Sequence, residues 1–431
     1  SLEMQERAGK RIPGMTQLLS KRPDLFSRGV WPGYYSRAKG AKIWDLDGNE
    51  FLDMSIGGIG ANVLGYADPD VDAAVVAAIA DGVSSSLNCP EEVELADLLC
   101  ELHPWADMVR FARAGGEAMA MAVRIARARA GRDVVAFCGY HGWHDWYLAA
   151  NVGADDALGD HLLSGLSPTG VPKGLKGTAL PFRYNRIDEL EAIVERNGDT
   201  LAAIVMEPIR NEEPEPGFFA AVRKIADEIG AVLIVDEISA GFRFLTGGAH
   251  LALFEQTPDM AVFSKGLGNG YSIAAVVGTQ GVMQAAQDSF ISSTNWTERV
   301  GPVAALTTIR KHREQNVVTH LNRLGERVQQ GWKDAAQSAG IGIHVGGMKA
   351  MSHFTLEGED ALERKAFFVQ AMLDRGILAS NVFYVMYAHS DEDVDRYLDA
   401  CGDIFAELAK IDDCRPLLRG APAISGFQRI A

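Results

Sequence analysis

The chain has 431 residues, of which 47% are hydrophobic and 23% are charged, and its formal net charge is −16. These proportions are typical of a globular enzyme, and the length indicates two or three domains, or one large domain with a smaller one attached. The acidic balance argues against non-specific binding to nucleic acids and against an anionic membrane surface, so we expect neither as a partner.

The first predicted element is a hairpin over residues 41–54 (AKIWDLDGNEFLDM), in which an Asp-Gly turn joins two strands. A helix is expected after the Ala-Gly-Gly sequence at 114–116, because apolar residues recur on one face of the turns that follow. Four short apolar runs then predict buried strands that end in polar or glycine residues: 133–140, 201–208, 231–237 and 259–266.

The segments 186–198 and 217–230 lie between these strands and have the apolar spacing of helices. Alternating strands and helices predict an α/β fold with a mostly parallel sheet covered by helices on both faces. A long helical stretch is expected after Gly301, followed by short strands near 341–356 and a helix near 391–408, with an extended surface tail.

Two domains are expected from this order of elements. We predict a large α/β domain over 56–305 and a small α+β domain, to which the N-terminal segment 1–55 contributes and which is completed by 306–431.

The cysteine pattern and the N-terminus indicate a cytoplasmic protein. The five cysteines are far apart and form no C-x-x-C pair, which argues against a zinc ribbon or a disulfide framework. The first residues lack the apolar core of a signal peptide, and no apolar run reaches the roughly 18 residues of a membrane span.

Polar residues follow the predicted strands at the positions where each strand ends. Asp236 follows AVLIV, Lys265 follows MAVFS, Glu207 follows AAIVM, and Tyr140 and His141 follow VVAFCG. Ligands of parallel α/β sheets bind at the carboxyl ends of the strands, so the topology brings these residues to one edge. Taken singly, Asp236 could equally be a helix cap or part of a structural ion pair, and Lys265 a surface lysine.

Gly115 and Gly116 precede the predicted helix, and Glu117 lies in its first turn. Glycines at a helix start expose backbone N–H groups that can bind a phosphate. The signal is weak alone, because Gly-Gly before a helix is usually only a turn, and it matches neither G-x-G-x-x-G nor the P-loop.

Together these parts meet the requirements of pyridoxal phosphate. A lysine can form a Schiff base, a carboxylate can hold a pyridinium nitrogen protonated, a helix N-terminus can bind a phosphate, and an aromatic side chain can stack on the ring. The motifs VDEISAGFR and SKGLGNG, with WDLDGNEFLDM, FARAGGEAMAMAVRIARA, YHGWHD and MEPI, resemble the class III (subgroup II) aminotransferases of fold type I. The resemblance is closest to glutamate-1-semialdehyde aminomutase and spans nearly the whole chain.

The resemblance implies a role for each residue around the cofactor ring. Lys265 would be the Schiff-base lysine and the proton shuttle, and Asp236 would pair with the pyridine nitrogen. Ile238 would pack on one face of the ring, Tyr140 would stack on the other, and Asn211 would face the phenolic oxygen, although it could also be an ordinary loop residue.

The resemblance also implies a shared phosphate site. Gly115 and Gly116 would bind the phosphate through backbone N–H groups, and Thr297 would complete the site of the partner subunit. A homodimer is therefore expected.

Departures from the aminomutase pattern favour a different reaction within the family. Ala114 and Gly116 stand where the family carries hydroxyl side chains, and the aminomutase glutamate near the C-terminal strand is absent. We therefore favour an aminotransferase that moves an amino group from a small-molecule donor to an aldehyde or ketone, with amino-sugar or secondary-metabolite biosynthesis as candidate settings. The alternatives are a 2,1-aminomutase and, more distantly, a non-catalytic regulator of the same fold, against which the retained lysine argues.

Overall fold

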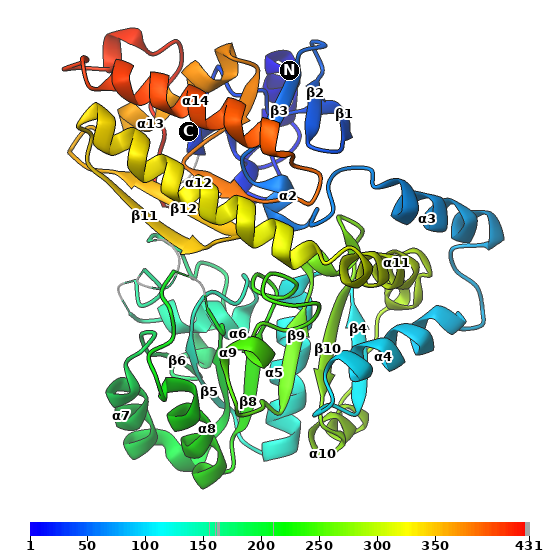
Figure 1. Ribbon diagram of the computed structural model, residues 1–431. Coiled ribbons are helices and arrows are strands. Elements are labelled where there is room, and N and C mark those ends of the chain that lie inside the picture. Colours follow the sequence, from blue (N-terminus) through cyan, green and yellow to red (C-terminus); the bar gives the residue numbers. More distant parts are fainter. Residues whose placement is uncertain (155, 160, 162–163, 210, 427–431) are drawn as a thin grey trace. The chain divides into compact units, whose positions relative to one another are not determined.

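The computed structural model describes residues 1–154, 156–159, 161, 164–209 and 211–426. The chain divides into two compact units (Figure 1). The smaller unit contains Ser1–Asp68 and Thr319–Ala431, and the larger unit contains Pro69–Val318. The expected boundaries at 55/56 and 305/306 stay a prediction about where independently folding domains begin and end.

The larger unit is built on a seven-stranded sheet. Its strands follow the order β4 (Met108–Ala112), β10 (Ala274–Gly278), β9 (Met260–Phe263), β8 (Val232–Asp236), β7 (Leu201–Met206), β5 (Val134–Cys138) and β6 (Ala179–Pro181). The five strands from β9 to β6 are parallel, whereas β10 is antiparallel to both of its neighbours. This confirms the predicted α/β fold with a mostly parallel sheet, and the four strands predicted from apolar runs are β5, β7, β8 and β9.

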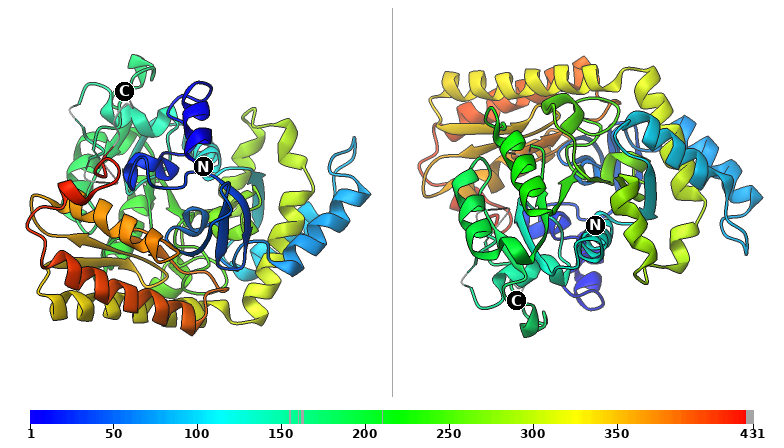
Figure 2. Two further views of the ribbon diagram at one scale, coloured as in Figure 1. Left: turned by 90° about the horizontal axis from the view of Figure 1, so that it is seen from above. Right: turned by 90° about the horizontal axis from the view of Figure 1, so that it is seen from below.

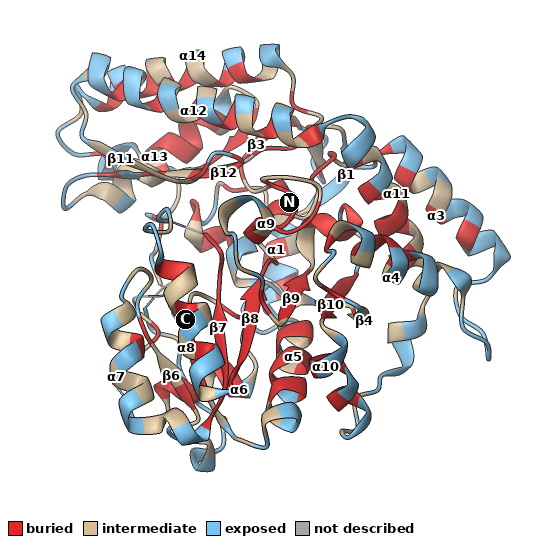
Figure 3. Cartoon of the chain, turned by 60° about the horizontal axis from the view of Figure 1, so that its bottom comes forward, coloured by how far each residue is buried: buried red, intermediate tan, exposed pale blue. Residues whose placement is uncertain are grey.

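Alternate side chains of the central strands pack against helices on opposite faces of this sheet. Ala203 and Val205 of β7 belong to the same core as α5 (Gly115–Ala130), whereas Ile204 and Met206 join α7 (Ile187–Asn197) and α8 (Phe218–Ile229). Every residue of β7, β8, β9 and β10 is buried, as Figure 3 shows in red. Burial on both faces explains why these strands appear as unbroken apolar runs in the sequence.

Further helices complete the larger unit. They are α3 (Pro69–Asp81), α4 (Pro90–Leu102), α6 (Asp145–Leu148), α9 (His250–Leu253), α10 (Gln280–Met283) and α11 (Val300–Glu314). Leu95 of α4 and Ile309 of α11 share a core with Ala261 of β9 and Val277 of β10, so these two helices cover part of the sheet at its β9–β10 side. Among the described residues, no helix combines the length and the apolar character needed to cross a bilayer.

The smaller unit contains two sheets. One has the order β1 (Tyr35–Lys39), β2 (Lys42–Asp45), β3 (Glu50–Met54) and β13 (Ile377–Ala379), and the other has β11 (Ile343–Met348), β12 (Met351–Leu356) and β14 (Val382–Tyr384). Its helices are α1 (Leu2–Gly9), α2 (Gly57–Gly60), α12 (Val317–Ala339, which starts in the larger unit), α13 (Ala361–Asp374) and α14 (Asp391–Leu408). The hairpin predicted over 41–54 is formed by β2 and β3.

Phe354 of β12 lies at the centre of the aromatic core of this unit. Its ring contacts Trp332 of α12, Phe368 of α13 and Phe405 of α14 with edge-on geometry. Figure 2 shows α12 in yellow and α14 in red-orange running side by side. Three helices are thus tied to the same strand by aromatic side chains.

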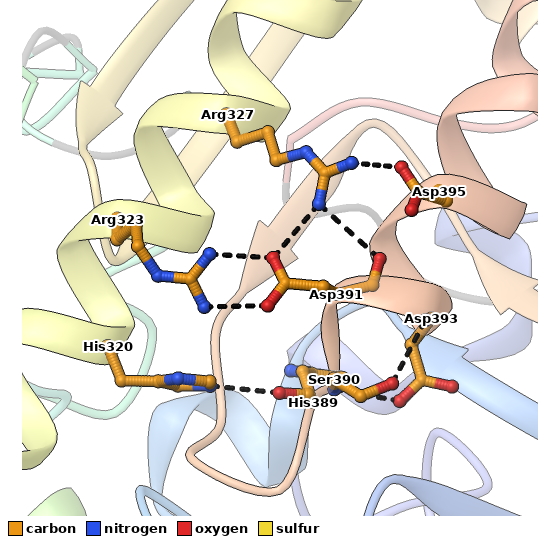
Figure 4. Close-up of polar contacts among 8 residues, drawn as sticks. All are labelled: His320, Arg323, Arg327, His389, Ser390, Asp391, Asp393 and Asp395. Carbon is orange, nitrogen blue, oxygen red and sulfur yellow. Dashed lines mark hydrogen bonds and ion pairs between the residues drawn. The ribbon is translucent and has the colours of Figure 1, made fainter.

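The start of α14 is fixed by an exposed polar network (Figure 4). The Ser390 hydroxyl accepts the Asp393 backbone N–H at 3.1 Å, and the Asp393 carboxylate accepts the Ser390 N–H at 2.9 Å, which is a capping box. Asp391 receives Arg323 of α12 through both carboxylate oxygens, at 2.6 and 3.0 Å, and Arg327 at 3.0 Å. The capping residues explain why the helix predicted near 391–408 begins at Asp391.

Two expectations for the C-terminal part need correction. The long helical stretch after Gly301 is two helices, α11 and α12, because Asn316 adopts a left-handed backbone conformation (φ +47°) that an α-helix cannot contain. The tail is only partly an extended surface segment, since Cys414 and Ala423 are buried and the Ile424 N–H donates to the Asp24 carbonyl at 2.9 Å.

Candidate active site

The carboxyl ends of four neighbouring strands form the edge at which the candidate site lies. The parallel registers pair Cys138 of β5 with Met206 of β7, Met206 with Val235 of β8, and Asp236 with Val262 of β9. The chain segments that follow these strands therefore leave the sheet at one edge, as the sequence predicted.

Asp236 is a buried carboxylate that meets the imidazole of His141. It is 3% exposed, and its Oδ2 lies 2.7 Å from Nδ1 of His141, while its Oδ1 accepts the Ile238 N–H at 3.0 Å. Nε2 of His141 lies 3.0 Å from the Cys138 carbonyl oxygen, so both ring nitrogens face oxygen atoms. The imidazole gives the buried carboxylate a hydrogen-bonding partner, which offsets part of the cost of burying it.

His141 was expected at a strand end, but the sequence indicated no role for it. Its position directly after β5, in the Tyr-His-Gly sequence at 140–142, was the available signal. The pairing itself depends on the loop after β5 turning back toward β8, which apolar periodicity does not reveal.

Lys265 has an unusual backbone conformation. Its φ is +40°, in the left-handed region that residues other than glycine rarely occupy. Its Nζ donates to Ser239 Oγ at 2.6 Å, and it begins the short 3₁₀ turn Lys265–Gly268. Strained backbone of this kind concentrates at functional sites, where the surrounding structure holds it in place.

The N-terminus of α5 is a tightly packed glycine cradle. A Cβ added to Gly115 would lie 2.8 Å from Cδ1 of Ile238, and one added to Gly116 would lie 3.3 Å from Cδ2 of His144. Gly142 has φ +103°, and its Cβ would lie 3.0 Å from Cα of Gly116. Only glycine allows the two backbones to approach this closely, and the first N–H groups of the helix lack intrahelical acceptors.

Tyr140 and Asn211 lie at the same sheet edge. The Tyr140 N–H donates to Oε2 of Glu207 at 3.0 Å, and its ring meets that of Tyr147 edge-on at 5.9 Å. Asn211 is exposed and lines a cavity of about 410 Å³ together with Glu207 and Tyr184. Tyr140 thus lies against the Glu207 carboxylate, and Asn211 lines the same cavity as this carboxylate.

Thr297 lies on a segment that hydrogen-bonds to the residue just before the glycine cradle. It is an exposed residue at the end of the 3₁₀ turn Thr294–Thr297, and its Oγ1 donates to the Thr294 carbonyl at 3.3 Å. Arg113, just before the cradle, donates to the Trp296 carbonyl at 2.9 Å and to the Glu298 carbonyl at 2.6 Å. Within the part of the chain that the structure describes, Thr297 makes no hydrogen bond to Gly115 or Gly116.

A second buried carboxylate, Glu237, follows Asp236 directly and was missed as a site residue. It is 1% exposed and accepts the Ala249 N–H at 2.9 Å, the His250 N–H at 2.8 Å and His250 Nδ1–H at 2.7 Å. Trp105 Nε1 donates to Nε2 of His250 at 3.0 Å, so this imidazole is neutral with its proton on Nδ1. Glu237 thereby fastens the end of β8 to the loop before α9.

Comparison with known proteins identifies the family. Residues 27–405 match the family described as aminotransferase class-III, so the chain belongs to the class III aminotransferases. It is therefore an enzyme of this class, and its cofactor is pyridoxal phosphate.

The curated relatives carry out different reactions of the family. The chain is 31% identical over 426 residues to 3-aminobutyryl-CoA aminotransferase from Cloacimonas acidaminovorans (strain Evry), covering 95% of this chain and 98% of the relative. It is 32% identical to 2'-deamino-2'-hydroxyneamine transaminase from Streptomyces kanamyceticus, covering 92% and 96%. It is 34% identical to glutamate-1-semialdehyde 2,1-aminomutase from Dechloromonas aromatica (strain RCB), covering 94% and 98%.

A solved structure supports the same assignment. The FumI protein from Sphingopyxis sp. MTA144, in its PLP internal aldimine form, is 26% identical, has a TM-score of 0.84, and is matched over 98% of both chains. The residues of the candidate site fit this cofactor, because a buried carboxylate, a lysine amine and a glycine cradle at a helix N-terminus lie at one sheet edge.

Proposed function

We propose that Lys265 is the residue to which pyridoxal phosphate is attached and that Asp236 pairs with its ring nitrogen. The pairing of β8 with β9 carries this proposal, because it places a buried carboxylate and a lysine amine at the ends of adjacent strands. His141 supports the role of Asp236, since its Nδ1 meets Oδ2 at 2.7 Å and holds the carboxylate in one orientation.

The remaining contacts of the cofactor follow from the same edge. Gly115 and Gly116 bind the phosphate through the free N–H groups at the start of α5, where the helix dipole also favours an anion. Ile238 packs on one face of the ring and Tyr140 on the other, and Asn211 faces the phenolic oxygen. The packing of Ile238 against the Gly115 backbone supports its place next to the phosphate.

The cofactor, when bound, supplies an aldehyde carbon and an electron-accepting ring through which an amino group passes from donor to acceptor. Asp236 keeps the proton at the ring nitrogen. Lys265, through its ε-amine, removes the α-proton of the donor and later returns a proton. The glycine cradle fixes the phosphate so that the reacting atoms stay aligned with this amine.

The phosphate site is completed by the partner subunit's Thr297 in a homodimer. Support comes from exposed apolar side chains of the larger unit, since Leu87, Trp143 and Phe290 are 82%, 69% and 86% exposed. Arg124 borders two of them: it donates to the Phe290 carbonyl at 3.1 Å and lines a surface cavity with Trp143. Apolar surface of this kind marks protein interfaces.

A mixing experiment tests the dimer assignment. A Lys265→Ala subunit and a Thr297→Ala subunit are each expected to be impaired alone. If Thr297 acts across the interface, a mixed dimer contains one site with both wild-type residues, and mixing restores activity. If Thr297 acts within its own subunit, mixing restores nothing and the assignment is wrong.

The substrates are a small-molecule amino donor and a carbonyl acceptor. The relative from Streptomyces kanamyceticus supports an amino-sugar substrate, and the aminomutase relative supports 2,1-aminomutase activity as the second candidate. A mutase converts one substrate without a separate carbonyl acceptor, so turnover with and without an acceptor separates the two. We place the enzyme in the cytoplasm, because its five cysteines are all unpaired, as expected in a reducing compartment.

The lysine assignment is tested by borohydride reduction of the enzyme with its cofactor, followed by peptide mass analysis. We expect the reduced cofactor on the peptide that contains Lys265 and no transfer activity in Lys265→Ala. Lys224→Ala is the matched control, since the Lys224 side chain is 75% exposed and pairs only loosely with Glu228 at 3.7 Å. Cofactor mass on another peptide would reject the assignment.

A further inference from the structure

The contact between Lys265 and Ser239 is set by the backbone register and not by one side-chain rotamer alone. The parallel pairing of β8 with β9 matches Asp236 with Val262. Ser239 lies three residues after Asp236, and Lys265 lies three residues after Val262. The two side chains therefore leave adjacent turns at the same level, and Nζ reaches Oγ at 2.6 Å.

The turn that carries Ser239 is held by the backbone on both sides. The Ile238 N–H donates to Oδ1 of Asp236 at 3.0 Å, and the Gly241 N–H donates to the Glu237 carbonyl at 2.8 Å. The Glu237 N–H continues the pairing with β9 by donating to the Val262 carbonyl at 2.9 Å. Ser239 is thus presented from a rigid turn.

The turn that carries Lys265 is equally fixed. The Leu267 N–H donates to the Ser264 carbonyl at 2.9 Å, and the Ser264 hydroxyl donates to the Ile273 carbonyl at 3.0 Å. The left-handed conformation of Lys265 (φ +40°) is stabilised within this turn. The lysine side chain has several rotatable bonds, so fixing its amine costs up to about 2 kcal/mol of rotamer entropy.

We propose that Ser239 is a positioning residue that holds the ε-amine of Lys265 whenever this amine is not bonded to the cofactor. The inference rests on the proposed role of Lys265. A hydroxyl suits the task because it is uncharged. It accepts an N–H from the amine and does not fix the amine as an ammonium ion, whereas a carboxylate at this place would. The amine then stays oriented and able to act as a nucleophile and a base.

Capture of the cofactor by the apoprotein measures this positioning apart from catalysis. The amine nitrogen adds to the aldehyde carbon, one C=N bond replaces the C=O bond, and the oxygen leaves as water with the two amine protons. The rate constant is followed by visible absorbance and the site by borohydride trapping at Lys265. Pyridoxamine phosphate has no aldehyde and cannot bond to the lysine, so its Kd reports the shape of the pocket alone.

We expect Ser239→Ala to slow capture about tenfold, the effect of one lost hydrogen bond, and to leave the Kd of pyridoxamine phosphate within about twofold. Ser239→Thr retains the hydroxyl and should restore most of the rate. Ser264→Ala is the matched control, because it removes a neighbouring hydroxyl that donates to the Ile273 carbonyl; it should slow capture less than Ser239→Ala does.

Two results would overturn the inference while the proposed function stands. The first is capture of the cofactor by Ser239→Ala at the wild-type rate. The second is an equal loss of the capture rate and of the affinity for pyridoxamine phosphate in Ser239→Ala, because it would mean that Ser239 only shapes the pocket. A wild-type apoprotein that captures no cofactor at Lys265 would instead reject the proposed function.

Discussion

Two polar clusters of this chain are built in opposite ways. At the sheet edge, Asp236 is 3% exposed and its carboxylate meets His141 and one backbone N–H. At the start of α14, the Asp391 side chain is 50% exposed and meets two arginines. The first cluster buries a charge beside a strained lysine, whereas the second spreads its charges over the surface (Figure 4).

This difference indicates which cluster serves function and which serves the fold. Exposed ion pairs contribute little to stability, because water already solvates both partners. A buried carboxylate must be stabilised by specific neighbours, and evolution retains such a group where chemistry needs it. Substitutions of equal size should therefore have very different consequences in the two places.

The largest effect is expected for Asp236→Asn. On the proposed role of Asp236, the amide cannot hold a proton at the cofactor ring, so we expect turnover to fall about 10³-fold, as for loss of a preorganised electrostatic contact. Steady-state transfer rates measure this loss. Asp391→Asn makes the same chemical change on the surface and should leave turnover unaltered; similar losses in both variants would remove the distinction between the clusters.

The next effect concerns Asp53, a buried acid of the smaller unit that lies outside the site. Burial raises the pKa of Asp53 to about 6, although hydrogen bonds from Tyr66 and from the Ser55 N–H oppose the rise. The folded state therefore holds the proton more tightly than the unfolded chain, with its ordinary value of 3.8. The stability that this group contributes is fully present below about pH 4 and is lost as the pH rises through about 6. The free energy of unfolding therefore falls by roughly 3 kcal/mol over this range.

Asp53→Asn isolates that dependence. Relative to wild type, the free energy of unfolding of the variant should rise between pH 4 and pH 7, as measured by urea titration at each pH. Asp391→Asn should stay nearly parallel to wild type over this range, because Arg323 lowers the pKa of Asp391 and its contribution is lost only as the pH falls below about 4. Parallel curves for Asp53→Asn and wild type would contradict the raised pKa.

A smaller effect is expected for Gly142→Ala, at the glycine cradle. A Cβ there would lie 3.0 Å from Cα of Gly116 on a backbone with φ +103°. The strain of about 1–3 kcal/mol should displace the start of α5 and weaken cofactor binding about tenfold. Gly131→Ala is the control at the other end of α5, since φ is +65° but no atom lies within 4 Å of the added carbon. If both variants bind the cofactor equally well, close backbone approach is not what Gly142 provides.

The sequence predicted the strands and their edge because burial on both faces leaves unbroken apolar runs. The ends of those runs placed Asp236 and Lys265 correctly at the carboxyl edge of the sheet. The contacts of these residues were not predictable in the same way. Ser239 meets Lys265 only through the register of β8 with β9, and His141 reaches Asp236 only because the loop after β5 turns back.

Errors elsewhere have similar physical causes. The break at Asn316 depends on one left-handed residue inside a segment whose apolar spacing is otherwise helical. The burial of Ala423 depends on contacts with residues near Asp24, some 400 positions earlier in the chain, and no local pattern records them.

The smallest effects are expected at the surface cluster itself, where two substitutions separate a cap from an ion pair. Ser390→Ala removes the side-chain acceptor for the Asp393 N–H and should lower stability by about 1 kcal/mol, because the first turn of α14 loses its cap. Arg323→Gln removes a bidentate contact to Asp391, yet Arg327 still meets the same carboxylate at 3.0 Å. We therefore expect Arg323→Gln to lower the thermal midpoint by less than Ser390→Ala does, and only at low salt, since salt screens exposed charges but not a cap.

Thermal unfolding at low and high ionic strength distinguishes the two contributions, and transfer activity should be unchanged in both variants. A larger and salt-independent loss of stability in Arg323→Gln would show that the surface cluster supports the fold as strongly as a buried contact.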